Sequence, residues 1–141
     1  MTYALSEPLQ RAVFEALLGD ATLSSFVGSD IYDAPLPLEV ANGPSEYVTL
    51  GGESVRDASS GSEDGALHDF TVIVHSNASG FMISKQIAGA ICDVLLDAQL
   101  PLARGKLVYL RFLKAKADAG IPPARRTITL NFRAFVEDTS S

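Results

Sequence analysis

The histidines and the cysteine are the residues whose side chains most often bind metals or act as catalysts. His68 and His75 are the only histidines and Cys92 is the only cysteine. The histidines lie seven residues apart on one expected strand, so their side chains point to opposite sheet faces and cannot share a metal. No Cys/His spacing of the zinc type occurs. We therefore expect no metal site and interpret both histidines as ordinary strand or surface residues.

A Cys–His nucleophile pair would need an exposed thiol beside an imidazole. Cys92 instead follows Ile91 in an apolar helical pattern, where a buried cysteine behaves as a small hydrophobic residue. A single cysteine also cannot form an intramolecular disulfide. The sequence therefore predicts no nucleophilic catalysis.

Four carboxylates gather in a segment rich in Gly, Ser, Asp and Glu, at residues 51–65: Glu53, Asp57, Glu63 and Asp64. They lack the alternating oxygen ligands and the bidentate Glu of a calcium loop. The glycines there lack the Lys-Ser/Thr ending and the following helix of a phosphate-binding loop. We predict a long, solvated acidic loop, which at this length is expected to be functional or mobile. The sequence thus predicts no catalytic, metal or cofactor-binding residue and no cofactor, so we expect no enzyme.

Charge is distributed unevenly along the chain. The formal net charge is −6, yet from Arg104 to Arg133 eight cations accompany a single acid, Asp118, which makes that segment +7. This asymmetry indicates either a basic element for an anionic partner or, as the alternative, a well-solvated hairpin.

The elements that position these residues follow from hydrophobic periodicity. Apolar residues at helical spacing predict helices over residues 6–18 and 80–97, with a short helical turn over 21–26. Ser6 is expected to cap the first helix, with Pro8 in its first turn. Alternation predicts strands over four ranges, namely residues 46–50, 66–75, 106–117 and 125–137.

Strand parity predicts one strongly apolar sheet face, which two helices would cover. Its residues are Val48, Leu50, Phe70, Val72, Val74, Val108, Leu110, Phe112, Ile128, Leu130, Phe132, Ala134 and Val136. The fold class is therefore α+β: a two-layer sandwich of a mostly antiparallel four-stranded sheet, two main helices on one face and a long C-terminal β-hairpin. The opposite face mixes apolar residues, such as Leu107 and Phe135, with polar ones, and is expected to be a docking face or ordinary surface.

The basic hairpin is expected to extend past the core. After Phe112, the same parity assigns Lys114 and Lys116 to the helix side, together with Arg126 on the partner strand. Three cations cannot lie under the helices without partners. We therefore predict that the end of this hairpin projects as a basic arm.

Length and composition fit a single domain over residues 1–141. The chain is 47% hydrophobic and 20% charged, which is typical of a folded protein rather than a disordered one. No apolar run reaches the length of a membrane helix, and the N-terminus lacks the basic start of a signal peptide. We expect a cytosolic protein without membrane contact.

Several segments resemble the tail-completion, or tail-terminator, proteins of long-tailed bacteriophages and phage-like gene transfer agents. They are residues 27–33 (VGSDIYD), 44–51 (PSEYVTLG), 68–76 (HDFTVIVHS), 107–112 (LVYLRF) and 129–134 (TLNFRA). The similarity covers nearly the whole chain. It implies an α/β sandwich that assembles as a hexameric ring, caps the tail tube at its head-proximal end and joins the tail to head-completion (stopper) proteins. DNA would pass through the lumen, and the family has no catalytic residues.

This resemblance implies a partner set of further copies of the chain, the tail tube protein, the stopper protein and, transiently, DNA. It also implies assembly in the host cytoplasm and a final place at the head–tail junction of a particle. Candidate assembly or lumen residues are Arg111, Lys114, Lys116, Arg125, Arg126, Arg133, Arg56 and Asp57. Two other classes remain open: a small ligand-binding or regulatory α+β domain, and, less favoured by the residues present, a small hydrolase.

Overall fold

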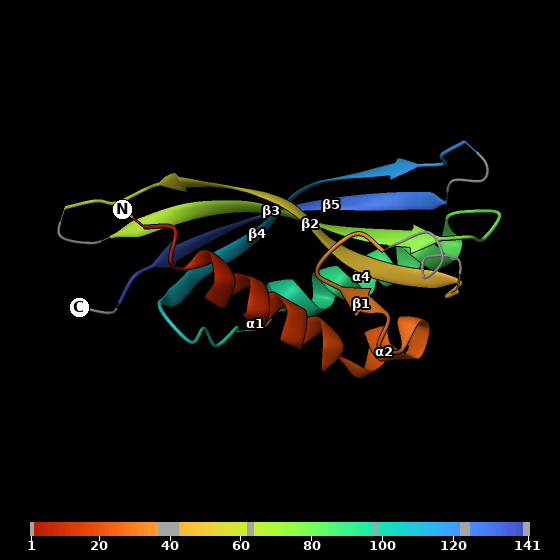
Figure 1. Cartoon of the computed structure of the whole chain (residues 1–141), viewed down its shortest axis with the longest axis horizontal. Helices are drawn as coiled ribbons and strands as arrows, with labels where there is room; N and C mark the ends of the chain where they lie inside the picture. The colour runs from red at the N-terminus through yellow and green to blue at the C-terminus, as the bar shows by residue number, and fades with distance from the viewer. Residues whose placement is uncertain (1, 37–42, 62–63, 98, 122–124, 140–141) are drawn as a thin grey trace.

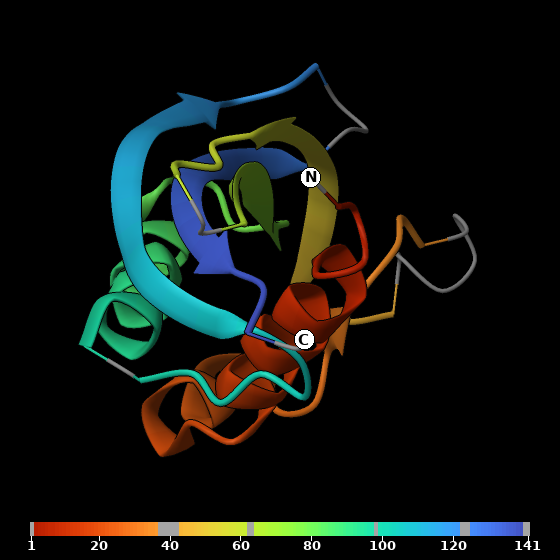
Figure 2. The ribbon, with the colours of Figure 1, turned by 90° about the vertical axis from the view of Figure 1, so that its left-hand side faces the viewer.

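The computed structural model describes residues 2–36, 43–61, 64–97, 99–121 and 125–139. Five strands form one sheet in the order β1-β2-β3-β5-β4, antiparallel except for the β1–β2 pair. The three described helices cover one face of this sheet (Figures 1 and 2). The elements are α1 (Ser6–Leu18), α2 (Ala21–Val27), β1 (Ile31–Tyr32), β2 (Glu46–Asp57), β3 (Gly65–Ser76), α4 (Met82–Asp97), β4 (Lys106–Asp118) and β5 (Arg126–Glu137).

The predicted α+β sandwich is present, with a fifth strand and a third helix added. Strand β1 is only two residues long and pairs in parallel with Val48 and Thr49 of β2. Helix α2 occupies the place of the predicted helical turn, and Asp20 caps it by accepting a 2.9 Å hydrogen bond from the Leu23 amide. Ser6 does not cap α1, because its hydroxyl donates to Glu53 of β2.

The core lies between the helices and the central strands β3 and β5. Along β5, alternate residues from Ile128 to Val136 are buried, as parity predicts. The helices contribute apolar residues at helical spacing, among them Leu9, Val13, Leu17, Ile87, Ile91 and Leu95. Phe132 is completely buried at the centre of this layer.

The predicted acidic loop over residues 51–65 is wrong, because most of it forms the arms of a β-hairpin. Strand β2 continues to Asp57 and pairs with β3, whose first residue is Gly65. The continuation passes through a register shift between Leu50 and Glu53. A Cβ at Gly51 would lie 2.1 Å from the Thr71 hydroxyl, so only glycine fits where the strand bends across β3. This hairpin extends beyond the N-terminal end of α1 (Figure 1).

Strand β4 departs from the predicted alternation because it contains two irregularities, one between Leu107 and Tyr109 and one between Phe112 and Lys114. Each adds an unpaired residue and reverses the facing of the strand residues after it. Val108, which parity assigns to the core, is the unpaired residue of the first irregularity and is 43% exposed. Phe112 keeps its predicted helix-side position opposite Phe132 but is also 43% exposed, because β4 is the edge strand. Leu107, which parity assigns to the opposite face, pairs with Val136 and packs against the core.

The second irregularity also overturns the predicted facing of the lysines. Lys114 and Lys116 lie opposite Asn131 and Thr129, so they are on the sheet face away from the helices. Ala115 and Ala117 take the helix-side positions instead, opposite Leu130 and Ile128. No buried cation therefore requires the hairpin end to leave the core within the described part of the chain.

Candidate assembly surface

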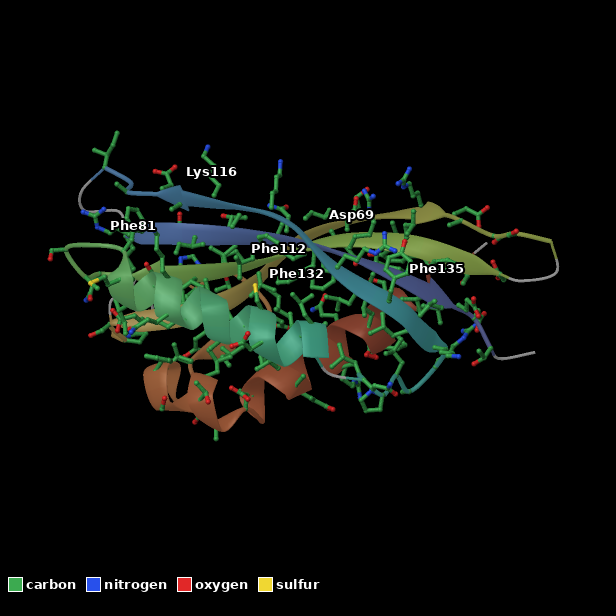
Figure 3. All side chains as sticks on the ribbon, turned by 180° about the vertical axis from the view of Figure 1, so that it is seen from behind. Asp69, Phe81, Phe112, Lys116, Phe132 and Phe135 are labelled. Atoms are coloured by element: carbon green, nitrogen blue, oxygen red, sulfur yellow. The ribbon has the colours of Figure 1, made fainter. Side chains whose placement is uncertain are left out.

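We call the sheet face turned away from the helices the outer face. No described helix or strand covers it. Figure 3 shows Lys116 above the sheet on this side, and Phe132 between the sheet and the helices. Cross-strand pairing places Asp69, Arg133 and Arg111 in one row across β3, β5 and β4. The face is thus built mainly from the alternate residues of these strands that do not enter the core.

An ion pair links β3 to β5 at the middle of the outer face. Arg133 donates to both carboxylate oxygens of Asp69, with Nε–Oδ1 at 2.7 Å and Nη2–Oδ2 at 2.9 Å. These hydrogen bonds lower the pKa of the Asp69 carboxyl and raise the pKa of Arg133. Arg133 therefore has a structural partner and is not a free cation of the surface.

Two aromatic rings, of Tyr109 and Phe135, lie beside this row of charged residues, where β5 pairs with the edge strand β4. Tyr109 packs against Phe135 at 5.7 Å between ring centroids, and the Arg111 guanidinium lies 4.1 Å from the Tyr109 ring. Such stacking holds the flat guanidinium while its charge stays accessible. Arg111 is exposed and forms no ion pair with any described residue.

A second cluster occupies the outer face at the start of β2. The rings of Tyr47 and His75 stack at 4.3 Å with an interplanar angle of 8°. Thr49 Oγ1 lies 2.9 Å from His75 Nε2. The guanidinium of Arg125 lies 5.2 Å from the centroid of the Tyr47 ring. Burial, and secondarily the charge of Arg125, lower the pKa of His75 to about 4. His75 is therefore neutral at physiological pH and is part of a packed cluster, which alternation alone did not reveal.

Lys114 and Lys116 are two further free cations of the outer face among the described residues. Both are exposed, and neither forms an ion pair with a residue that the structure describes. They lie on one side of β4 with polar Asn131 and Thr129 opposite them. This part of the face can accept an anionic partner without first breaking an internal ion pair.

The other predicted assembly residues are divided between the two sides of the sheet. Arg126 lies on the helix side, where it donates to the carbonyl oxygens of Ala78 and Ser79 and stacks on Phe81 at 4.8 Å. It therefore does not join the two lysines, contrary to the prediction. Asp57 accepts hydrogen bonds from Ser59 in the β2–β3 turn. Arg56 is exposed on the outer face of the same hairpin.

His68 is a strand residue, as interpreted from the sequence, and is fully buried on the helix side of β3. Neither ring nitrogen has a hydrogen-bond partner among the described residues. Burial lowers the pKa of His68, although the charge of Glu53 opposes that shift. The opposite facing of His68 and His75 was predicted correctly from their spacing.

No compact chemical site is found within the described ranges. They contain no group of three His, Cys, Asp or Glu side chains able to hold a metal. A hollow of about 870 Å³ opens along the C-terminal end of α4, the segment that follows it and the first half of β4, and six of its twelve lining residues are leucines. Its lining includes Gln99, Lys106 and Tyr109 but no His, Asp or Glu side chain. None of the described helices is long and apolar enough to cross a bilayer.

The chain is similar to a known protein family and to a solved structure. The family described as tail completion protein gp17 matches residues 11–137. A chain in the structure titled "Virion of native gene transfer agent (GTA) particle" is similar at 45% sequence identity and a TM-score of 0.84, over 96% of this chain and 99% of that one. No match was found among curated proteins. The chain belongs to the tail completion protein gp17 family, a structural family of virion particles and not an enzyme family.

Proposed function

We propose that copies of this chain form a ring, a hexamer, that terminates the tail tube at its head-proximal end. In this role the ring joins the tail to the head-completion proteins, and DNA passes through its lumen. Family membership over residues 11–137 and the 45% identical chain of a virion particle support a structural role in a phage-type tail. Assembly takes place in the host cytoplasm, and the mature location is the head–tail junction.

The observation that carries the proposal is the uncovered outer face with its free cations. A ring subunit requires two different surfaces, because each copy contacts the next heterologously. Here one layer exposes Arg111, Lys114 and Lys116, whereas the helical layer exposes acids such as Glu7 and Glu15. We assign the outer face to the lumen, where lysine and arginine can contact DNA phosphates.

The β2–β3 hairpin supplies a second contact in this proposal. Its end extends past the helices (Figure 1) and carries the acids Asp57 and Asp64, whereas Glu53 lies beside the start of α1 and accepts a hydrogen bond from Ser6. A protruding acidic hairpin suits contact with a neighbouring ring, either of the tail tube protein or of the stopper protein. Arg125 and Arg126 lie at the opposite end of the sheet and have internal partners, so we assign them a structural rather than a lumen role.

Electron microscopy of purified particles, with a small epitope tag on this chain, tests the proposal. We expect one ring of label at the junction between head and tail, and native mass spectrometry of the isolated ring should give six copies. Label along the tail shaft, at the distal tip or absent from particles would contradict the assignment.

A further inference from the structure

Two strand edges lack a neighbouring strand in the described part of the chain, that of β4 over its whole length and that of β2 over about half. Strand β4 is the last in the sheet order, and its residues 111–118 are all exposed. On the other side, β1 pairs only with Val48 and Thr49, so residues 52–57 of β2 have no strand beyond them in the described part of the chain. The unpaired N–H and C=O groups of such edges are templates for another strand.

Residues 111–118 form the free half of β4. Only their outer-face side chains carry charges that discourage pairing with a strand of another chain. The outer-face positions of this half carry Arg111, Lys114 and Lys116 besides Asp118, and one bulge disturbs the ladder, and both features discourage random association. Its helix-side positions are Phe112, Ala115 and Ala117, which are apolar and exposed. Leu113, the unpaired residue at the bulge, is also 44% exposed. An uncharged, uncovered strip along a strand edge is suited to burial against a second chain.

The two free edges are compatible in direction and net charge. Strands β2 and β5 run one way and β3 and β4 the other, so β4 of one copy beside β2 of the next continues the antiparallel sheet. Residues 111–118 carry a net charge of +2 and residues 52–57 a net charge of −1. One local contact opposes the junction, because Arg56 shares its face with Lys114 and Lys116.

The free halves lie at different levels of the sheet, so pairing them requires a stagger. Through β5 and β3, Ala115 is level with Val72, whereas Val55 is level with His68, four positions away. Pairing Val55 with Ala115 or with Ala117 of the adjacent copy displaces that copy by four or six residues. At ~3.3 Å per residue the displacement is roughly 13–20 Å. Both shifts are even, so the outer faces remain continuous.

This stagger matches the geometry of a closed barrel. Each copy contributes four strands between junctions, a width of about 19 Å at ~4.8 Å spacing. A displacement of roughly 13–20 Å over that width tilts the strands by about 35–45°, the tilt that closed barrels adopt. Six copies would give a backbone diameter of about 50 Å. An unstaggered contact is blocked, since β1 occupies the edge of β2 at Val48 and Thr49.

From these observations we propose that the free edge of β4 in one copy pairs with the free edge of β2 in the next copy. The ring would then be closed by one sheet that is continuous across subunits, with the helices outside. This inference rests on the proposed ring and identifies the contact that builds it. The partner at this edge is accordingly a second copy of the chain, not the tube protein or the stopper protein.

Disulfide trapping in particles tests the junction. In a Cys92→Ala background, Val55→Cys is combined with Ala115→Cys for the four-residue stagger, or with Ala117→Cys for the six-residue stagger. After oxidation of purified particles, one of these pairs should give a ladder of linked subunits on a non-reducing gel. Each single-cysteine variant should give nothing larger than a dimer.

A matched pair, Thr22→Cys with Ala115→Cys, places one thiol on exposed α2 and should remain monomeric. Suppose that microscopy locates the ring between head and tail, but that both cysteine pairs across the β4–β2 contact stay monomeric or that the matched pair gives an equal ladder. The proposed edge pairing is then wrong, although the proposed ring is not contradicted. If the labelled subunit is absent from that position, the ring and the junction both fail.

Discussion

Asp69 and Arg133 join two central strands through a bidentate ion pair on a half-exposed surface. Because exposed pairs are screened by water, we expect Asp69→Asn to lower the free energy of unfolding by only about 1 kcal/mol at pH 7. The loss should shrink in 1 M salt. Since the pKa of Asp69 is lowered in the folded state, its contribution is present above the ordinary Asp pKa and is lost as the pH falls through the folded value.

Urea unfolding at low and high salt measures this effect. Asp93→Asn, which removes an exposed carboxylate on α4, is the control and should change stability by less than about 0.5 kcal/mol. An equal loss in both variants would show that the ion pair contributes nothing specific.

His75 should make the fold sensitive to mild acid. Its pKa is about 4 in the folded state, below the ordinary histidine value, so the unfolded chain binds the proton more readily between these two values. Stability is therefore complete above about pH 6.5 and falls as the pH approaches 4, by about 2–3 kcal/mol for this group. His75→Phe keeps a ring against Tyr47 and removes the titration.

Urea midpoints measured every half pH unit from 7.5 to 4.5 compare the two proteins. The variant should lose less stability than the wild type over this range, although His68 titrates in the same direction in both. Parallel curves would contradict the assigned role of His75.

At the scale of elements, β5 divides the molecule into a buried side and an outer side. Phe132 is fully buried, whereas Phe135 is half-buried on the outer face. We expect Phe132→Ala to destabilise by about 3–5 kcal/mol through the lost contacts and the cavity. Phe135→Ala, the matched control on the same strand, should cost about 1–2 kcal/mol because water already reaches the site. Denaturant unfolding measures both, and equal losses would contradict the assignment of the two faces.

The elements themselves were largely predictable from local pattern. Helix α1 has the predicted bounds, β4 and β5 each differ from prediction by one residue at one end, and β3 is one residue longer at each end. The continuation of β2 to Asp57 was missed, since Gly51, Gly52 and Ser54 have weak strand propensity and the structure there depends on pairing with β3.

At the scale of the whole molecule, the free lysines are predicted to serve assembly or DNA passage rather than folding. Reversing both, as Lys114→Glu with Lys116→Glu, should change the free energy of unfolding by less than about 1 kcal/mol, because neither residue has an ionic partner among the described residues. Particle yield or DNA transfer should fall several-fold. Arg11→Glu with Lys85→Glu makes the same change in charge on the helical layer and serves as the control.

Thermal or urea unfolding of the purified chain, together with counts of particles and of transferred DNA, separates the two effects. Normal particles and normal transfer with the lysine variant would show that this part of the outer face is only solvated surface.

Local sequence pattern was enough to predict the helices and the central strands, because these depend on periodicity and residue type. It also carried the similarity to tail-completion proteins. The tertiary structure alone decided which face the residues of β4 occupy, because one unpaired residue at each bulge reverses the alternation that parity assumes. It likewise separated Arg126 from Lys114 and Lys116, since Arg126 stays on the helix side that parity predicts, whereas the second bulge moves the two lysines to the outer face.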